Sequence, residues 1–215
     1  MTFPTNVIQS SSNWNIDRPA AVVPAPWKIS VAHGLDEILQ VISLRAISYI
    51  HEQNCPYAEE VDGNDFAGAT HLLAKVGNEP VGCARLRWFA GFFKLERIAV
   101  AHAHRKSGLG PAIMEASFEL GVRKGYTEVL GHVEPAIVEH WKRKCGLEPR
   151  PNRSPLYFSD NQYVEVGRSF ASHPLAITIN SDPMILLRPE GDWDCAGVLD
   201  QSNFRNHEFE TAKIA

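Results

Sequence analysis

The sequence predicts an α/β (α+β) domain in which helices flank a mixed, mostly antiparallel central sheet. A helical pattern of apolar residues follows a short strand near residue 28, and two β-type segments then follow across a turn at residues 77–79. Two later units each place a strand before a helix. Because several strands occur in succession, the regular alternation of a doubly wound fold is excluded. A chain of 215 residues, 44% of them hydrophobic, suffices for one such domain.

The first half of the chain predicts a strand, a helix and a hairpin. Residues 27–32 read as a short strand, and the next segment repeats apolar side chains at helical spacing: Leu35, Ile38, Leu39, Ile42 and Ala46. Residues 51–69 are polar and rich in turn signals, which predicts a long surface loop. Loops of this length often belong to a site. Strands at 70–76 and 80–89 then form the hairpin.

The second half predicts two strand-then-helix units. Its elements are strands at 92–101 and 127–133, helices at 111–124 and 136–145, and further strand-like sequence at 163–170 and 183–188. Pro111 suits the first turn of a helix, and Gly125 and Gly146 are typical of residues that end one. The strand-like sequence near the C-terminus predicts a possible homodimer.

Composition and the termini restrict what the protein is expected to bind. A net charge of −4 gives no electrostatic footprint for nucleic acid. No window approaches 18 consecutive apolar residues and the N-terminus lacks a signal-peptide pattern, so we expect a cytoplasmic protein without membrane contact. We divide the chain into an N-terminal arm (1–26), a main domain (27–188) and a C-terminal tail (189–215), and assign no chemistry to the arm.

The sequence gives no indication of a metal site. The four cysteines are scattered without C-x-x-C spacing: Cys55, Cys83, Cys145 and Cys195. His102 and His104 alternate as two ligands on one strand would, but no cysteine or carboxylate accompanies them at ligand spacing. We therefore expect no metal.

The strand-to-helix junction at residues 96–118 carries the main functional signal. It lacks the lysine of a P-loop, because Gly110 is followed by Pro111 and Ala112. It also lacks the third glycine of a dinucleotide-binding fingerprint, whose place Ile113 takes. The remaining loop combines two cations with two glycines: Arg105, Lys106, Ser107, Gly108, Leu109 and Gly110. Such a loop can turn backbone N–H groups toward an anion at the helix N-terminus, or it can be an ordinary helix start with solvated cations.

The pattern R-x-x-G-x-G directly after "RIAV", within the run from 95 to 147, resembles the GCN5-related N-acetyltransferase (GNAT) superfamily. Residues 44–74 resemble its ElaA-like branch, and the likeness extends over roughly 28–188. The resemblance implies a GNAT-type sheet with a splayed strand pair and acetyl-coenzyme A (acetyl-CoA) as co-substrate. It further implies that the loop from Arg105 to Gly110 binds the pyrophosphate. The pantetheine arm would contact the preceding strand at Ile98, Ala99 and Val100.

The resemblance also implies catalytic roles on this strand and its neighbour. A backbone N–H at Val100 would stabilise the oxyanion. Glu96, expected on the same face as Val100 from strand parity, is a candidate general base, but it can also be a salt-bridged or substrate-orienting carboxylate. His132 and Glu134, at the end of the following strand, are alternative bases. Lys142 stands where the family often has tyrosine, so it could stabilise the coenzyme A thiolate or simply face solvent.

Several polar residues are candidates for contact with the acceptor. Arg45 and Glu52, with the polar segment that follows, could face an acceptor across the cofactor cleft. Arg85 and Arg87 alternate with Leu86 on one strand, which predicts a polar face toward the cleft and an apolar face toward the core. Arginine is well suited to bind a carboxylate on the acceptor.

Three functions are compatible with these features. The first is transfer of an acetyl group from acetyl-CoA to a primary amine on a small molecule or peptide, by direct attack in a ternary complex. The second uses a longer acyl donor, as in the autoinducer-synthase branch that shares this fold. The third is a coenzyme A-binding module without turnover, which the missing tyrosine would favour.

Overall fold

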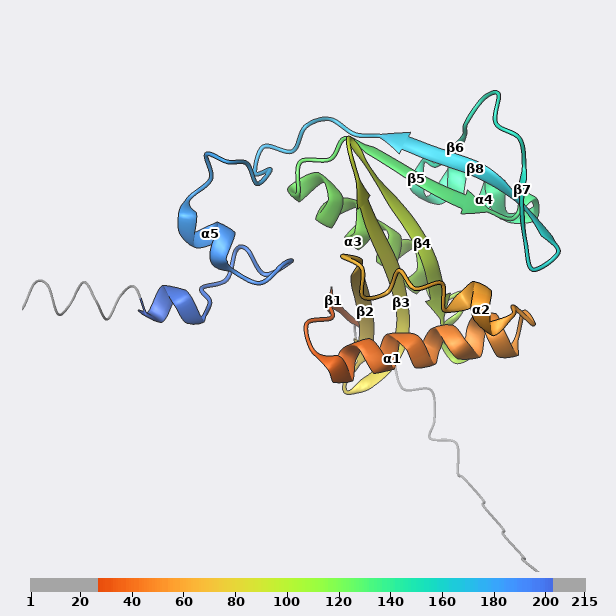
Figure 1. Ribbon diagram of the computed structural model, residues 1–215, viewed down its shortest axis with the longest axis horizontal. Coiled ribbons are helices and arrows are strands. Elements are labelled where there is room, and N and C mark those ends of the chain that lie inside the picture. Colours follow the sequence, from red (N-terminus) through yellow and green to blue (C-terminus); the bar gives the residue numbers. More distant parts are fainter. Residues whose placement is uncertain (1–26, 203–215) are drawn as a thin grey trace, which may run out of the picture.

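The structure, a computed structural model, describes residues 27–202, in which helices flank one open sheet (Figure 1). The predicted arm (1–26) and the end of the predicted tail (203–215) lie outside the described residues. The sheet has the strand order β1-β2-β3-β4-β5-β8-β6, and β7 pairs with β8. The strands are β1 (Lys28–Val31), β2 (Thr70–Val76), β3 (Glu79–Phe89), β4 (Phe92–Val100), β5 (Glu128–Val133), β6 (Glu148–Pro149), β7 (Leu156–Phe158) and β8 (Asn161–Ser169). Within residues 27–202 only β4 and β5 pair in parallel, which confirms the predicted mixed, mostly antiparallel sheet.

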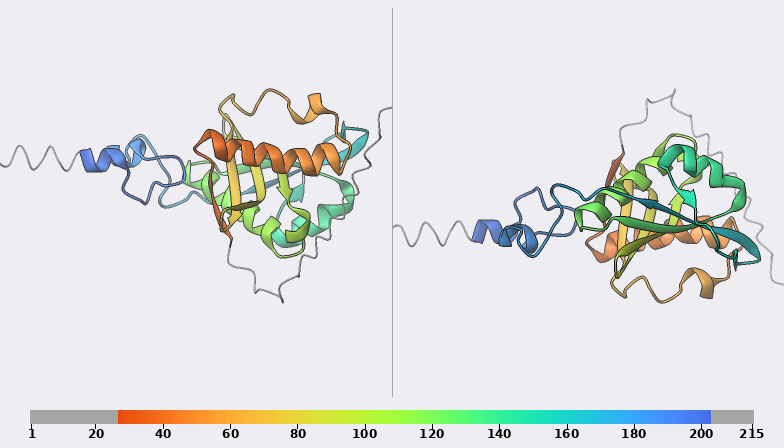
Figure 2. Two further views of the ribbon diagram at one scale, coloured as in Figure 1. Left: turned by 90° about the horizontal axis from the view of Figure 1, so that it is seen from below. Right: turned by 90° about the horizontal axis from the view of Figure 1, so that it is seen from above.

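Helices cover the two faces of the sheet (Figure 2). They are α1 (Leu35–Arg45), the π-helix η1 (Ala46–His51), α2 (Tyr57–Glu60), the 3₁₀ turns η2 (His102–His104) and η3 (Pro135–Ile137), α3 (Leu109–Arg123), α4 (Val138–Cys145) and α5 (Pro183–Leu187). The α1 and α2 helices lie on one face, and α3 and α4 lie on the other. The main core lies between α3 and the sheet, where Leu86, Phe93 and Ile113 are fully buried.

Two predicted elements differ from the observed ones. The helix predicted from residue 35 ends its α-helical part at Arg45 and continues as the π-helix η1. The strand-like sequence at 183–188 forms the short helix α5 instead, because the Asp182 carboxylate caps it by accepting from the Met184 N–H at 2.8 Å. Periodicity alone does not separate a short apolar strand from a helix of this length. A homodimer remains a prediction.

The β4 and β5 strands separate after two paired residues. Phe93 pairs with Val129, and Lys94 pairs with Leu130. Beyond them β4 continues to Val100 while β5 stays paired with β8 along its whole length. This divergence is the splayed strand pair that the family resemblance implies.

A β-bulge interrupts β4 at Arg97. Glu96 lies opposite Arg85, and Ala99 lies opposite Cys83, so β4 holds one more residue than β3 between these two pairs. Arg97 has a left-handed φ of 55°, a conformation typical of the extra residue in a bulge.

The bulge reverses the alternation of side chains along β4. Directly opposed residues of an antiparallel pair share a face. Val100 lies opposite Gly82, where an added Cβ would meet Ile113 of α3, so Val100 faces α3. The prediction that Glu96 shares a face with Val100 is therefore wrong. Glu96 points to the α1 face, because the inserted residue shifts the register by one.

The described part of the predicted tail packs on the same core as the domain. The side chain of Trp193 is among the buried residues of the main core, although it follows the predicted boundary at residue 188. Arg123 of α3 donates to both carboxylate oxygens of Asp194, at 2.8 and 3.0 Å. Lys124 pairs with Glu190 beside it. These contacts join the segment to the end of α3.

A methyl group at Gly121 should destabilise the fold. A Cβ built there would lie 2.4 Å from a ring carbon of buried Phe93. We expect Gly121→Ala to lower the free energy of unfolding by about 1–3 kcal/mol, in spite of the better helix propensity of alanine. Urea unfolding would measure the change. Gly34→Ala, where an added Cβ would have no atom within 4 Å, is the control without a steric clash; its loss should be limited to the poorer N-cap that alanine gives α1, below about 1 kcal/mol. Equal stability of both variants would contradict this packing.

Candidate functional site

A cavity of about 190 Å³ fills the space that opens between β4 and β5. Its apolar walls come from both strands and from the helices below them, with Ile98 on β4, Val133 on β5, Met114 on α3 and Trp141 on α4, and polar groups make up the rest of the lining. The splayed strands therefore enclose a slot suited to an extended group with both apolar and polar parts.

Along the slot, the edge of β4 that points away from β3 has no neighbouring strand in the described part of the chain. The Tyr49 hydroxyl donates to the Ile98 carbonyl at 2.7 Å, and Arg105 Nε donates to the Val100 carbonyl at 3.0 Å, so both carbonyls point away from β3. The N–H and C=O of one strand residue point to the same edge. The N–H groups of Ile98 and Val100 are therefore directed toward the slot as well.

The loop between β4 and α3 has a backbone suited to an anion. Lys106 and Gly108 have left-handed φ values of 62° and 92°, and such residues beside a helix start direct successive N–H groups to one side. A Cβ added at Gly108 would have no atom within 4 Å, so this side of the loop is open. The Ser107 hydroxyl accepts from the Leu109 N–H at 3.3 Å and donates to the His104 carbonyl at 2.6 Å, which fixes the turn.

The second glycine of the loop serves helix packing. A Cβ at Gly110 would lie 3.4 Å from the ring of Trp141, so a small residue here lets α3 and α4 approach closely. Its side-chain position thus faces α4.

Glu52 is not in the place expected for acceptor binding. It forms an ion pair with Arg105 and lines neither cavity described here. The pair joins the end of the first helical segment to the loop before α3. The predicted contact of Glu52 with an acceptor is therefore replaced by a contact with the loop.

A second cavity of about 360 Å³ lies on the α1 side of the sheet. It meets the first, because both are lined by Tyr49, Gln53, Glu96, Arg97, His132 and Tyr163. Charged side chains of β3 and β4, among them Arg87 and Lys94, form one side of it. Tyr157, Phe158 and Ser159 from the β7–β8 hairpin form another. We refer to the first cavity as the slot and to the second as the acceptor cavity.

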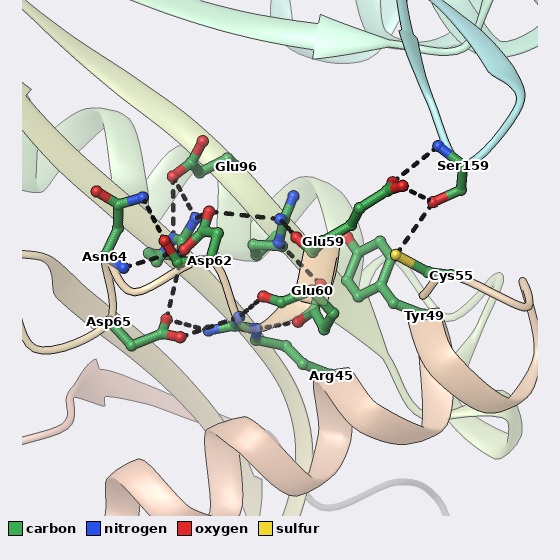
Figure 3. Close-up of polar contacts among 12 residues, drawn as sticks. Arg45, Tyr49, Cys55, Glu59, Glu60, Asp62, Asn64, Asp65, Glu96 and Ser159 are labelled. Atoms are coloured by element: carbon green, nitrogen blue, oxygen red, sulfur yellow. Dashed lines mark hydrogen bonds and ion pairs between the residues drawn. The ribbon is translucent and has the colours of Figure 1, made fainter. Parts of the chain in front are cut away.

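A buried network of charges holds the long loop 52–69 against this cavity (Figure 3). Arg85, which has no exposed side-chain area, donates to both oxygens of Asp62 at 2.8 and 2.6 Å and to Asp65 at 2.9 Å. Arg45, 2% exposed, pairs with Glu60 and Asp65. Arg97 pairs with Glu60 at 2.8 Å. The network thus connects α1, the loop, β3 and the β4 bulge.

This network corrects the predicted roles of Arg45 and Arg85. Both guanidinium groups are surrounded by carboxylates of the chain and neither lines a cavity described here. They position the loop, and the structure does not place them against an acceptor. The predicted polar face of β3 is nevertheless present, since Arg87 on the same strand lines the acceptor cavity while Leu86 is fully buried in the core.

Glu96 lies in the cleft as an anion that is already paired. Burial would raise the pKa of this carboxyl, but its contacts with Lys94 at 2.7 Å and with Arg85 at 2.8 Å outweigh burial and lower it below the usual value. A carboxylate with a lowered pKa accepts a proton poorly. The geometry therefore favours the orienting role among those considered for Glu96.

His132 lies between the two cavities and is suited to accept a proton. Burial, together with the charge of Lys94, lowers the pKa of its imidazole below the usual 6.5, so the ring is neutral near pH 7. Its Nε2 is buried and has no hydrogen-bond partner among residues 27–202. The nearest carboxylate oxygen of Glu165 lies 3.7 Å from Nε2, close enough to stabilise a protonated ring.

The two other predicted catalytic side chains differ in position. Glu134 lines the slot, at the end of β5. Lys142 does not line either cavity; its ammonium pairs with Glu148 at 2.9 Å, and the side chain is 43% exposed. Of the two possibilities considered for Lys142, the structure therefore favours the side chain that faces solvent. Its neighbour Trp141 faces the slot, because α4 turns that side of the helix inward.

Three residues of the cleft were not singled out from the sequence. Tyr49 falls within a regular-looking helical pattern, and nothing in that pattern signals the π-helix that places its hydroxyl on β4. Arg97 interrupts an otherwise apolar strand, a signal that could have indicated the bulge. Tyr163 lines both cavities from a strand whose partner, β5, could not be deduced from sequence.

The fold and this cleft define the class of an acyltransferase, and comparison with known proteins identifies the family. The model of the acetyltransferase (GNAT) family matches residues 38–146. The chain therefore belongs to the GNAT acetyltransferase family, which confirms the resemblance seen in the sequence.

Individual relatives agree with this assignment. An uncharacterised N-acetyltransferase, YjcF of Bacillus subtilis, is 29% identical over 116 residues, which cover 54% of this chain and 82% of YjcF. The crystal structure of Escherichia coli ElaA is similar in fold, with a TM-score of 0.58 and 21% identity over 67% of this chain and 99% of ElaA. A GNAT family acetyltransferase of Elizabethkingia anophelis, solved with acetyl-CoA bound, has a TM-score of 0.52 and 15% identity over 67% of this chain and 98% of that protein.

Residues 27–202 contain neither a candidate membrane span nor a candidate metal site. No helix there has the length and apolar character to cross a membrane. No group of three or more His, Cys, Asp or Glu side chains in that region is placed to hold a metal ion.

Removal of the Asp65 carboxylate from the buried charge network should destabilise the fold. Asp65 accepts from both Arg45 and Arg85, and its side chain is 6% exposed. We expect Asp65→Asn to lower the free energy of unfolding by about 3–5 kcal/mol at pH 7, because two buried cations lose a shared partner. Asp36→Asn, at an exposed site of α1, is the matched control and should change far less.

Acid should remove the difference between the parent and Asp65→Asn. Although burial opposes it, pairing with Arg45 and Arg85 lowers the pKa of Asp65. The stabilisation by the ionised Asp65 is therefore complete above the pKa of about 4 that an aspartate has in the unfolded chain. It is lost as the pH falls through the lower pKa of Asp65 in the folded state. Denaturant unfolding at several pH values would show this. A difference that stayed constant down to pH 2 would contradict the ion pairs.

Proposed function

We propose that the protein transfers an acetyl group from acetyl-CoA to a primary amine by direct attack in a ternary complex. The observation that carries the proposal is the slot between β4 and β5, which shares walls with a polar cavity on the other face of the sheet and is lined by the strand that leads into the anion-suited loop. A thioester in the slot and an amine in the acceptor cavity would meet where the two cavities share their walls.

Backbone and loop geometry support acetyl-CoA as the donor. The amide groups of a pantetheine arm could pair with the free edge of β4 at Ile98 and Val100, as a strand would. The pyrophosphate would lie at the open side of Gly108, near Lys106 and the first N–H groups of α3. Arg105 is positioned by Glu52 and the Val100 carbonyl, from where it would add a positive charge.

The proposed reaction needs one proton acceptor and one oxyanion donor. The amine nitrogen attacks the thioester carbonyl carbon, the new C–N bond forms, and the C–S bond breaks to release the coenzyme A thiolate. The N–H of Val100 would stabilise the oxyanion. Glu96 would orient the acceptor while it is still an ammonium ion, which gives up one proton to solvent before the attack. His132 would take the second proton from the nitrogen as the C–N bond forms. Water would protonate the thiolate.

Binding of acetyl-CoA should depend on the open side of Gly108. We expect Gly108→Glu to weaken binding at least about 30-fold in a calorimetric titration, because a carboxylate would lie where the pyrophosphate is proposed. Gly108→Ala places a side chain at the same left-handed φ without adding charge, so it should weaken acetyl-CoA binding only a few-fold. Equal losses in the two variants would assign the effect to the backbone and contradict an anion site.

Removal of the proposed base should slow chemistry and leave donor binding intact. We expect His132→Gln to lower kcat by about 10²–10⁴-fold with an unchanged Kd for acetyl-CoA. For the parent, kcat/KM should fall as the pH drops through the lowered pKa of His132, because a protonated imidazole cannot accept the proton.

The matched variants are Glu96→Gln and Glu134→Gln, and coenzyme A release with a thiol reagent would measure all of them. The acidic limb of the pH profile should be retained in both. If that limb vanished in Glu96→Gln and persisted in His132→Gln, the base would be Glu96.

A further inference from the structure

One arginine of the acceptor cavity lacks a counter-ion. Arg45, Arg85 and Arg97 each pair with carboxylates of the chain. No carboxylate among residues 27–202 lies within 4 Å of the Arg87 guanidinium, although this side chain lines the cavity and is partly buried. Its recorded contact is with the face of the Phe89 ring, 5.1 Å from the guanidinium carbon. The planar donors of Arg87 are therefore available to a ligand.

A second cation lies directly opposite Arg87. Arg87 on β3 pairs in register with Lys94 on β4, so both side chains leave the sheet on the same face. Like charges at directly opposed positions are destabilising. Lys94 pairs with Glu96, which also accepts from the fully buried Arg85. An anion bound between Arg87 and Lys94 would offset the repulsion of the two opposed cations.

The two cations are positioned beside the proposed reaction centre. Lys94 pairs with Leu130 where β4 and β5 begin to separate, and His132 is two residues farther along β5 on the same face. Arg87, Lys94 and His132 all line the acceptor cavity. One molecule could therefore place an anionic group against the cations while its amine faces His132.

The opposite wall of the cavity is aromatic. Tyr157 and Phe158, on the β7–β8 hairpin, are 68% and 44% exposed and line this cavity. Exposed aromatic side chains in a cavity suit an apolar part of a ligand.

We propose that the acceptor is an amino carboxylate, an amine with a free carboxylate that Arg87 and Lys94 bind and with an apolar body against the aromatic wall. This inference rests on the proposed acetyl transfer. Arginine presents a planar pair of donors that matches a carboxylate, and Lys94 adds a second charge. Neutral amines of the same shape lack this anchor and are poorer acceptors.

Matched acceptor pairs test the inference. Aromatic α-, β- and γ-amino acids are compared with their own carboxamides in a coenzyme A release assay, using the parent, Arg87→Ala, Arg87→Lys and the surface control Arg143→Ala. We expect Arg87→Ala to lower kcat/KM for the best carboxylate roughly 10- to 100-fold and for its carboxamide less than about 3-fold. Arg87→Lys should lose less kcat/KM for the carboxylate than Arg87→Ala, and Arg143→Ala should have the kcat/KM of the parent. Comparing the ratio of the two acceptors between proteins cancels the different basicity of their amines.

The outcomes separate this inference from the function on which it rests. Two results would overturn the carboxylate anchor and leave acetyl transfer intact. In the first, Arg87→Ala loses the same factor in kcat/KM with the carboxylate and with the carboxamide. In the second, the parent prefers carboxamides. Absence of coenzyme A release with every acceptor, in a parent that binds acetyl-CoA by calorimetry, would overturn both. The comparison reports on the acceptor site only if Arg87→Ala binds acetyl-CoA with the same Kd as the parent.

Discussion

The structure depends on the divergence of β4 from β5 after the pair Lys94–Leu130. Buried backbone groups need hydrogen-bond partners, so an edge exposed inside a sheet must be served by side chains, water or a ligand. On β4 the Tyr49 hydroxyl donates to the Ile98 carbonyl and Arg105 donates to the Val100 carbonyl. Tyr49 comes from the π-helix and Arg105 from the loop before α3, so the divergence also fixes where these two segments lie. The slot, its backbone edge and the adjoining anion-suited loop follow from this single feature.

The buried charge network performs a different task from the apolar core. Exchanging a buried ion pair for apolar residues is often neutral or stabilising, so Arg85 and its carboxylates are weak evidence for stability as such. Their geometric effect is clear, because they hold the bulge at Arg97 and loop 52–69 in one arrangement. Glu96 is kept ionised at the centre of the cleft. A fixed negative charge at this position suits the cationic amine that we propose as acceptor, while the neighbouring His132 stays neutral.

Much of the fold was predictable, and the site only in part. The loop from Arg105 to Gly110 could be located because its spacing is local, as could the strand before it and the helix after it. The face of Glu96 could not, since one inserted residue reverses strand parity and a bulge leaves little trace in sequence. Arg45 and Arg85 were expected to meet an acceptor. Which carboxylates neutralise an arginine depends on the path of a long loop, and composition does not specify that path. Lys142 was matched to a tyrosine position of the family, and that match did not determine the side of α4 that faces inward.

Hydrogen exchange with and without acetyl-CoA tests most directly whether the slot is the donor site. Amide exchange would be followed by mass spectrometry on peptides that cover residues 95–112, with β1 and β2 as internal references. We expect slower exchange at Ile98 and Val100 and at the first residues of α3, because their N–H groups would pair with pantetheine and pyrophosphate. Saturating acetyl-CoA that left these amides unchanged, or that protected only residues away from the slot, would contradict the central claim.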